Sequence, residues 1–151
     1  MTRIANIFRL VISAFLASLG FSCFYGGNGG GYAEYGSPHA TYKVKGVVVS
    51  EENDSPIVGI RAELREEYSY SNYVIATAYT DSQGVFFLQG SAFPRATLNV
   101  ELTDVDGEIN GSFVSMNIEA DFSNKTFTGG SGAWYDGEAE IDLGIIRMKP
   151  E

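Results

Sequence analysis

The chain has 151 residues, which is enough for one ordinary domain with short appendages. Ten Lys and Arg against 19 Asp and Glu give a formal net charge of −9, the opposite of the basic surface that a duplex-binding protein needs. One cysteine excludes an internal disulfide and a cysteine-based metal cluster, and one histidine excludes the common two- and three-histidine metal sites. We therefore expect no nucleic-acid partner and no cofactor.

Residues 1–22 have the pattern of a secretory signal peptide that forms a short helix. Arg3 and Arg9 give a basic start without an acid, and the apolar run LVISAFLASLGF covers residues 10–21. These twelve residues are too few to span a hydrocarbon core of about 30 Å, which needs about 20. The segment therefore predicts export rather than a permanent membrane span.

The only cysteine, Cys23, follows this apolar run after one residue, Ser22. The segment from Leu19 to Cys23, LGFSC, resembles a bacterial lipoprotein box, which implies that Cys23 carries acyl chains such as palmitate and becomes the first residue of the mature protein. The alternative is a buried or incidental thiol at the end of an uncleaved segment. Loss of Arg3 and Arg9 with the signal would leave a charge of −11. Anionic headgroups would repel such a chain, so two acyl chains would have to hold it on the membrane.

Residues 23–40 are predicted to be a flexible tether. The run GGNGGG at residues 26–31 has no side chains to bury and much backbone entropy to lose. A phosphate-binding loop would need a preceding strand, a following helix and a lysine, which the surrounding sequence does not provide. The run therefore favours a spacer between a lipid anchor and a folded domain.

Residues 41–149 have the pattern of an all-β domain. Apolar and polar residues alternate with a period of two, which is typical of strands with one buried face. Turn dipeptides such as Asp106–Gly107 and Asp136–Gly137 separate the alternating segments. We predict a seven-stranded Greek-key β-sandwich of the transthyretin-like or immunoglobulin-like type. The expected strands cover residues 42–49, 60–65, 73–79, 85–88, 98–103, 116–122 and 141–148.

The last expected strand contains a change of parity at Gly144. Ile141 and Leu143 fall on odd positions, whereas Ile146 and Met148 fall on even ones. A β-bulge at Gly144 would return both pairs to the core face, because it adds one residue to one strand. Without the bulge, half of the strand would turn its apolar side to solvent.

Several of these segments carry a resemblance to a known domain family. Residues 42–48, the turn 54–56 and residues 57–62 resemble the start of a carboxypeptidase-regulatory-like domain, which is a transthyretin-like or prealbumin-like sandwich. Residues 80–86 fit the Thr-Asp-x-x-Gly-x-Phe pattern of that family. The resemblance implies the same sandwich as the alternation of apolar and polar residues.

The chain as a whole resembles a narrower group, the lipoproteins associated with radical SAM enzymes in Bacteroidota. Residues 10–23, 34–46 and 129–135 carry this likeness, and residues 34–46 are its most distinctive part. The resemblance implies a functional link to a radical SAM enzyme as partner. It brings no catalytic residues that could be transferred to this chain.

Candidate chemistry is weak at two places. His39, the only imidazole, lies beside Pro38 at the start of the first expected strand, where a surface or cap role outweighs a catalytic one because no Gly-x-Ser-x-Gly elbow is present. Asp104, Asp106 and Glu108 are close in sequence and offer the oxygen ligands that calcium prefers. We interpret them as a solvated hairpin tip, with calcium as the weaker alternative.

Acidic residues alternate along the last expected strand, at Asp136, Glu138, Glu140 and Asp142. Paired carboxylates can cleave glycosidic bonds when a cleft separates them by about 5–10 Å. Alternation with apolar neighbours instead makes these acids the solvent face of a strand, where charge also discourages edge-to-edge aggregation.

Two aromatic segments are candidates for a ligand or partner surface. Trp134 and Tyr135 follow the loop GGSGA, and a single tryptophan is either core filling or an exposed platform for sugars or proteins. Tyr68 and Tyr70 lie in the polar, Tyr-rich stretch 66–73, which is either an ordinary exposed turn or a recognition loop.

These observations together predict an exported lipoprotein, anchored by acyl chains on Cys23 to the cell envelope, at the outer rather than the inner membrane. Its sandwich is expected to be a non-catalytic interaction or structural module with a radical SAM enzyme or another envelope protein as partner. The alternative is a carbohydrate-binding surface module. A third hypothesis, a client that a radical SAM enzyme modifies, rests on family likeness alone.

Overall fold

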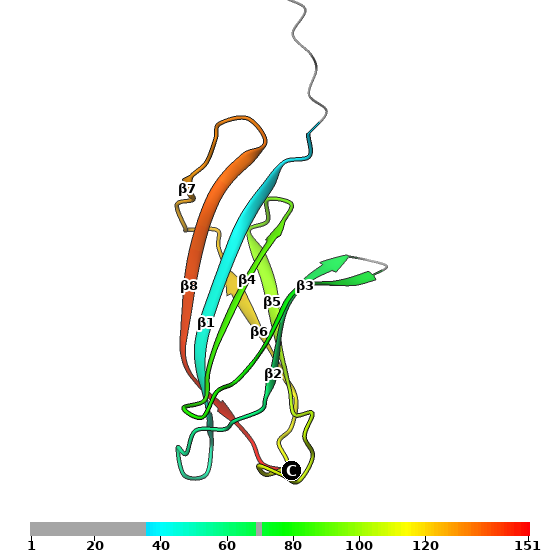
Figure 1. Cartoon of the computed structure of the whole chain (residues 1–151), viewed down its shortest axis with the longest axis vertical. Helices are drawn as coiled ribbons and strands as arrows, with labels where there is room; N and C mark the ends of the chain where they lie inside the picture. Colours follow the sequence, from blue (N-terminus) through cyan, green and yellow to red (C-terminus); the bar gives the residue numbers. More distant parts are fainter. Residues whose placement is uncertain (1–35, 69–70) are drawn as a thin grey trace, which may run out of the picture. The chain divides into compact units, whose positions relative to one another are not determined.

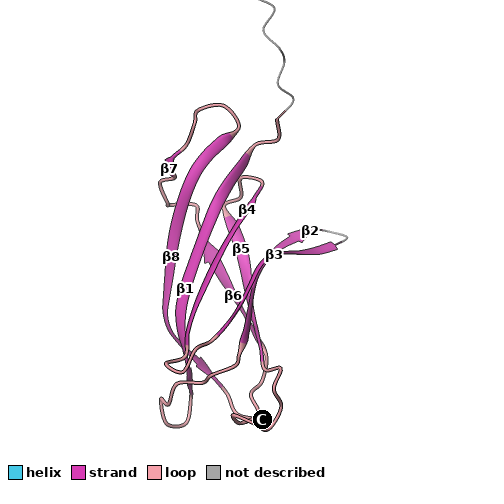
Figure 2. Cartoon of the chain, in the orientation of Figure 1, coloured by secondary structure: helices cyan, strands magenta, loops and turns pink. Residues whose placement is uncertain are grey.

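Eight strands and no helix make up the part of the chain that the structure, a computed structural model, describes: residues 36–68 and 71–151 (Figure 1 and Figure 2). Within these residues, no helix is long and apolar enough to cross a bilayer. The predicted signal peptide, Cys23, residues 24–35 of the tether and Tyr70 lie outside the described residues. The strands are β1 (His39–Ser50), β2 (Arg61–Tyr68), β3 (Ser71–Tyr79), β4 (Val85–Ala92), β5 (Thr97–Thr103), β6 (Met116–Asp121), β7 (Thr128–Gly129) and β8 (Tyr135–Met148).

The strands form two four-stranded sheets. Sheet A has the strand order β4-β1-β8-β7, and sheet B has the order β3-β2-β5-β6. β1 pairs antiparallel with β4 and parallel with β8, whereas every pair in sheet B is antiparallel. Apart from the hairpins β2–β3, β5–β6 and β7–β8, each connection crosses from one sheet to the other. The predicted all-β sandwich is confirmed for the described residues.

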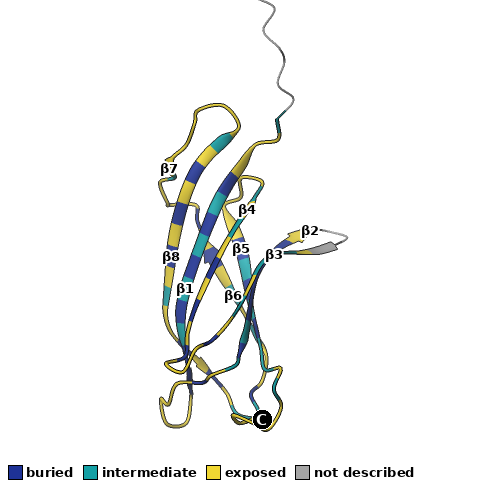
Figure 3. Cartoon of the chain, viewed as in Figure 1, coloured by how far each residue is buried: buried dark blue, intermediate teal, exposed yellow. Residues whose placement is uncertain are grey.

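The core lies between the two sheets and follows the predicted alternation (Figure 3). Each of the alternating apolar residues expected at positions 60–64 and 98–102 is at most 2% exposed. A fully buried aliphatic or aromatic side chain contributes about 1.5–3 kcal/mol relative to an exposed one, so these rows supply the main stabilising term. The largest fully buried side chains are Tyr42, Phe86, Phe122, Ile60, Leu64, Leu88, Leu102, Met148, Val44, Val48 and Val100.

The predicted bulge in the last strand is confirmed at Gly144. The pairing of β1 with β8 shifts by one residue in this region, and Gly144 has a φ of +68°. Ile141 on one side and Ile146 on the other are both about 7% exposed or less, whereas Ile145 is 61% exposed. The extra residue therefore places both halves of β8 on the core, and the exposed isoleucine is its by-product.

Several details differ from the sequence prediction: among them, β4 extends to Ala92 and β8 begins at Tyr135, well before the expected start. The eighth strand, β7, has two residues that pair with the start of β8. β1 begins at His39 rather than residue 42. The expected loop over 66–73 is wrong in part, because Glu66–Tyr68 and Ser71–Tyr73 are paired strand residues. The Asp136–Gly137 dipeptide is not a turn: it lies within β8, where Gly137 pairs with β7.

Candidate functional site

A groove of about 450 Å³ opens at the end of the domain where β1 begins. Two of its aromatic side chains face solvent, Tyr73 with 62% and Phe93 with 49% of its surface exposed. The wall is largely apolar, and its residues come from the start of β1, the β2–β3 hairpin and the end of β4. They are Ser37, Pro38, His39, Glu66, Tyr73, Ser91, Ala92 and Phe93.

Tyr73 reaches this groove because of a bulge in β3. The pairing between β2 and β3 skips Ile75 between the positions of Leu64 and Arg65. In an unbroken register a valine would lie opposite Glu66, but the extra residue puts Tyr73 there. The bulge therefore brings an aromatic ring and a carboxylate to the same side of the hairpin.

Ile75 itself makes a close contact between the two sheets. Its side chain packs against the core, over Gly90 of β4. A Cβ atom on Gly90 would lie 2.5 Å from Ile75 Cγ2 and 2.8 Å from the Ile75 carbonyl oxygen, so this contact requires a glycine. Beyond it the outer part of the β2–β3 hairpin projects away from the sandwich (Figure 1). The groove occupies the opening between the hairpin and the end of β4.

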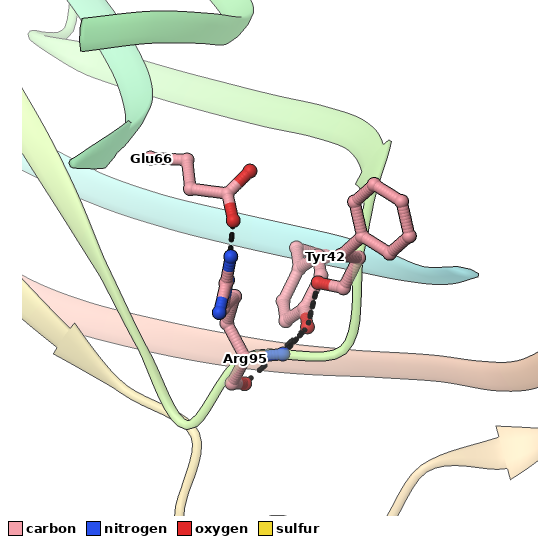
Figure 4. Close-up of polar contacts among 4 residues, drawn as sticks. Tyr42, Glu66 and Arg95 are labelled. Atoms are coloured by element: carbon pink, nitrogen blue, oxygen red, sulfur yellow. Dashed lines mark hydrogen bonds and ion pairs between the residues drawn. The ribbon is translucent and has the colours of Figure 1, made fainter. Parts of the chain in front are cut away.

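The β4–β5 loop, which carries Phe93, is fastened by the buried side chain of Tyr42 (Figure 4). The Tyr42 hydroxyl accepts the Arg95 backbone N–H at 2.5 Å and lies 3.1 Å from the Phe93 carbonyl oxygen and 3.3 Å from that of Arg95. Burial raises the pKa of Tyr42 above its ordinary value of 10.0. The phenol therefore stays neutral at physiological pH and can both donate and accept in this loop.

Glu66 lines the groove and pairs with the Arg95 guanidinium (Figure 4). Glu66 is 6% exposed, so the cation offsets the cost of burying its charge. A second, polar hollow of about 390 Å³ also has Glu66 and Arg95 in its wall. Its residues are Glu66, Glu67, Arg95, Thr97, Leu98, Asn99 and Glu119.

His39 lies on the surface, where its position predicted it. Its Nδ1 is 3.2 Å from the Ser37 carbonyl oxygen, which fits donation of a ring N–H within the same segment. Its ring centroid is 5.1 Å from that of Tyr135. These contacts fit a residue that organises the start of β1.

The aromatic residues proposed as a surface fall into two groups. Trp134 is 38% exposed and packs against Gly36, and its carbonyl oxygen accepts the His39 N–H at 2.8 Å. Tyr135 is half-buried, and its hydroxyl lies 3.2 Å from Thr41 Oγ1. Trp134 thus remains available to a ligand. Tyr68 and Tyr70 cannot be placed beside it, because the Tyr68 side chain and Tyr70 lie outside the described residues.

The three candidate calcium ligands serve loop structure in different ways. Asp104 accepts two backbone N–H groups, from Asp106 at 3.2 Å and from Phe113 at 3.0 Å. The Asp106 carboxylate accepts the side-chain amide of Asn110, and Glu108 is exposed at the turn. Among residues 36–68 and 71–151, no group of three His, Cys, Asp or Glu side chains is placed to hold a metal ion.

The acids of β8 form the predicted solvent face of the strand. Lys43 pairs with Glu138 at 2.7 Å, and Lys45 pairs with Glu140 at 2.8 Å and with Asp142 at 3.7 Å. The hydrogen bond to Glu140 raises the pKa of the Lys45 ammonium. Cross-strand charge pairing occupies these carboxylates, as expected for the exposed face of a sheet.

Sequence reasoning missed the groove because its parts become neighbours only through the fold. Tyr73 was visible in the Tyr-rich stretch, but its pairing with Glu66 depends on a bulge that the alternation did not mark. Phe93 and Arg95 stand in the short segment FPR, which has no motif that predicts binding. The sequence feature that did point to this region was the stretch 66–73, in which acidic residues and tyrosines follow one another as on an exposed surface.

Comparisons with known proteins give weak likenesses of fold. A 9R-lipoxygenase from Cyanothece PCC8801 has a TM-score of 0.41 and 16% identity over 71% of this chain and 16% of its own. The C-terminal domain of a shaft pilin from Lactobacillus rhamnosus GG has a TM-score of 0.41 and 11% identity, and the match covers 74% of this chain and 98% of that domain. A major pilin subunit of Bacillus cereus has a TM-score of 0.40 and 10% identity, and the match covers 75% of this chain and 30% of the subunit.

These likenesses give no functional argument, because their TM-scores and identities are too low. The chain spans only 16% of the lipoxygenase and 30% of the Bacillus pilin subunit. No protein-family model matches the chain, and no curated protein matches it either. The two family resemblances noted in the sequence therefore stay predictions.

Proposed function

We propose that the chain is a lipid-anchored extracytoplasmic protein whose sandwich is a non-catalytic interaction module. The observation that carries the proposal is the position of Cys23, which follows a twelve-residue apolar run with a basic start after the small residue Ser22. The folded unit begins at Gly36, which leaves a glycine-rich segment between that cysteine and the domain. This order of signal, cysteine, spacer and sandwich suits a module held near a membrane.

The chemistry of the groove supports an interaction role. Glu66 is engaged by Arg95, Tyr42 by the β4–β5 loop, and His39 by Ser37. A general base needs a reacting group within hydrogen-bond distance, and these groups instead support backbone and loop structure. We also propose the finer fold assignment, a transthyretin-like Greek-key sandwich, and the link to a radical SAM enzyme that the family resemblance implies.

The anchor is tested by changing Cys23 alone. Cys23→Ser removes the thiol that would carry the acyl chains, so the protein should move from the membrane fraction to the soluble fraction. The matched control is Ser22→Ala, which keeps Cys23 and replaces the residue before it with another small residue, and it should leave the protein on the membrane. Inhibition of lipoprotein signal peptidase should leave a larger precursor. Membrane retention of Cys23→Ser equal to that of wild type would refute the anchor.

Separation of inner from outer membranes on a density gradient tests the proposed location. We expect the wild-type protein with the outer-membrane fraction. Recovery with the inner membrane would reject that location and leave the lipid anchor intact. Intact mass of the extracted protein measures acylation directly, and it also reveals any further modification by a radical SAM enzyme.

A carbohydrate-binding surface is the second candidate, because the domain exposes aromatic rings at one end. Trp134, Tyr73 and Phe93 are 38%, 62% and 49% exposed, and aromatic faces can stack on sugar rings. A glycan array and titration of the tryptophan fluorescence with oligosaccharides test this function. Binding that disappears in Trp134→Ala would support it, and silence in both measurements would reject it.

A further inference from the structure

We propose that the apolar groove and the polar hollow form one site for an extended segment of a partner protein. A large apolar side chain of that segment lies between Tyr73 and Phe93, and a lysine or arginine close to it in sequence enters the polar hollow. This inference rests on the proposed function of the sandwich as an interaction module, and it names the chemistry of the partner.

The two hollows share one wall residue, Glu66. Its carboxylate pairs with Arg95, which lines the polar hollow. The apolar part exposes two aromatic rings, which supply contact area with little side-chain entropy to lose. A ligand that reaches both hollows therefore meets aromatic surface in one and charged groups in the other.

Charge complementarity identifies the second side chain. The polar hollow has three carboxylates, those of Glu66, Glu67 and Glu119, against one guanidinium, that of Arg95. Glu67 and Glu119 are exposed, whereas Glu66 is compensated by its ion pair. The local excess of negative charge favours a cationic side chain, and the net charge of −9 attracts a basic partner over a longer range.

The shape of the surroundings favours an extended backbone. In the described part of the chain, β3 and β4 are each the outermost strand of their sheet, and both border the groove. The polar hollow is lined from β2, β5 and β6, so a segment that reaches both hollows passes beside these edges with an extended backbone and does not pair with them along its length. Because successive side chains of a strand point to opposite faces, an apolar residue and a basic residue two positions apart lie on the same side.

A peptide library tests the inference. The full-length protein in detergent is immobilised through a biotin tag at its C-terminus, which lies at the opposite end of the domain from the start of β1 (Figure 1). A displayed library of random dodecapeptides is selected on this protein. We expect enriched sequences with a large apolar residue and a Lys or Arg within two positions of it. Dissociation constants are then measured for one enriched synthetic peptide and for its Lys-to-Glu counterpart.

Matched variants locate the binding. Tyr73→Ser should weaken the enriched peptide about tenfold or more, whereas Tyr79→Ser changes another exposed tyrosine of β3 outside the groove and should leave the affinity unchanged. Glu67→Lys should weaken the Lys peptide and remove its advantage over the Glu counterpart. Glu52→Lys, in the β1–β2 connection, makes the same charge change as its control. Thermal unfolding of each variant checks that it is folded.

Three outcomes would overturn the inference: no enrichment, enrichment without a basic residue, or affinity unchanged in both Tyr73→Ser and Glu67→Lys. Binding of an uncharged glycan that Tyr73→Ser abolishes, in the absence of peptide binding, would assign the groove to carbohydrate instead. Peptide binding by the purified protein is independent of acylation. Failure here therefore rejects this partner chemistry, whereas membrane retention of Cys23→Ser would reject the anchor.

Discussion

Glu66 of β2 lies directly opposite Tyr73 of β3, one residue away from the partner that the rest of the hairpin register would give it. The single extra residue, Ile75, has two effects that are coupled in space. It places Tyr73 beside Glu66 on the groove, and it packs over Gly90 where the two sheets meet. The groove therefore depends on a packing contact that lies close to its aromatic residues in sequence but outside its wall.

The contact between Ile75 and Gly90 predicts that Gly90→Ala is destabilising. The added Cβ atom would lie 2.5 Å from Ile75 Cγ2, so β3 has to move away from β4. We expect a loss of about 1–3 kcal/mol in the free energy of unfolding, measured with urea. The double variant Gly90→Ala with Ile75→Ala is the test of cause: the glycine substitution should cost less in that background. The contact with the Ile75 carbonyl oxygen remains in that background, so an equal cost in both would show that this backbone contact, and not the side chain, is the source of the strain.

Tyr42→Phe is predicted to destabilise the β4–β5 loop and the groove with it. The variant removes the hydroxyl that accepts the Arg95 N–H and bonds to the loop carbonyls, so the free energy of unfolding should fall by about 1–3 kcal/mol. Urea titration at pH 7 measures this loss. The same hydroxyl at the groove predicts weaker binding of any groove ligand to the variant. A change below about 0.5 kcal/mol would mean that the loop is held by other contacts.

The pH dependence of the free energy of unfolding, compared between wild type and Tyr42→Phe, provides an independent check. Because burial holds the folded pKa of Tyr42 above 10.0, the unfolded chain loses this proton first. The contribution of the neutral phenol is therefore complete below pH 10 and is lost as the pH rises through the folded pKa. The stability difference between wild type and Tyr42→Phe should shrink as the pH rises from about 10 to the folded pKa. A constant difference would contradict the raised pKa.

Much of this fold could be predicted from the sequence, because one buried face per strand leaves a clear period of two. The apolar rows at 60–64 and 98–102, and even the bulge at Gly144, follow from that parity alone. The β3 bulge could not be predicted in the same way. The stretch 66–73 has polar or tyrosine side chains at nearly every position, so a shift of register leaves no misplaced apolar row.

The candidate site was less predictable because its polar residues resemble surface residues in the sequence. Glu66 is followed by another glutamate and looks solvated, yet it is 6% exposed and paired with Arg95, 29 positions away. Trp134 illustrates the opposite case, since the usual burial of a single tryptophan favours the core and the structure leaves 38% of it exposed. Burial of charge depends on distant partners, which local pattern does not reveal.

Asp104 is predicted to act as a structural residue of the loop that follows β5. Its two oxygens accept the N–H groups of Asp106 and Phe113, so Asp104→Ala should lower the free energy of unfolding by about 1–3 kcal/mol, since two donors lose their partner. Glu108→Ala, at the exposed turn of the same loop, is the control and should change stability by less than about 0.5 kcal/mol. Calcium tests the alternative: a rise in unfolding temperature with millimolar calcium that Asp104→Ala abolishes would show a metal site.

Substitutions at Gly144 separate the conformational role of the bulge from its role in register. The residue has a φ of +68° and open space around its Cα, so a side chain there meets strain but no clash. Gly144→Val should cost about 1–3 kcal/mol in the free energy of unfolding. Gly144→Asn should cost less, because asparagine tolerates this backbone conformation.

Deletion of Gly144 should be far more damaging than either substitution. It removes the extra residue, so either Ile141 or the pair Ile146 and Met148 must turn to solvent. Met148 is fully buried and Ile146 is 6% exposed, and the loss of two such side chains from the core amounts to about 3–6 kcal/mol. Circular dichroism and urea titration should show an unfolded or strongly destabilised protein. A deletion variant as stable as Gly144→Asn would mean that β8 does not need the bulge to keep both halves on the core.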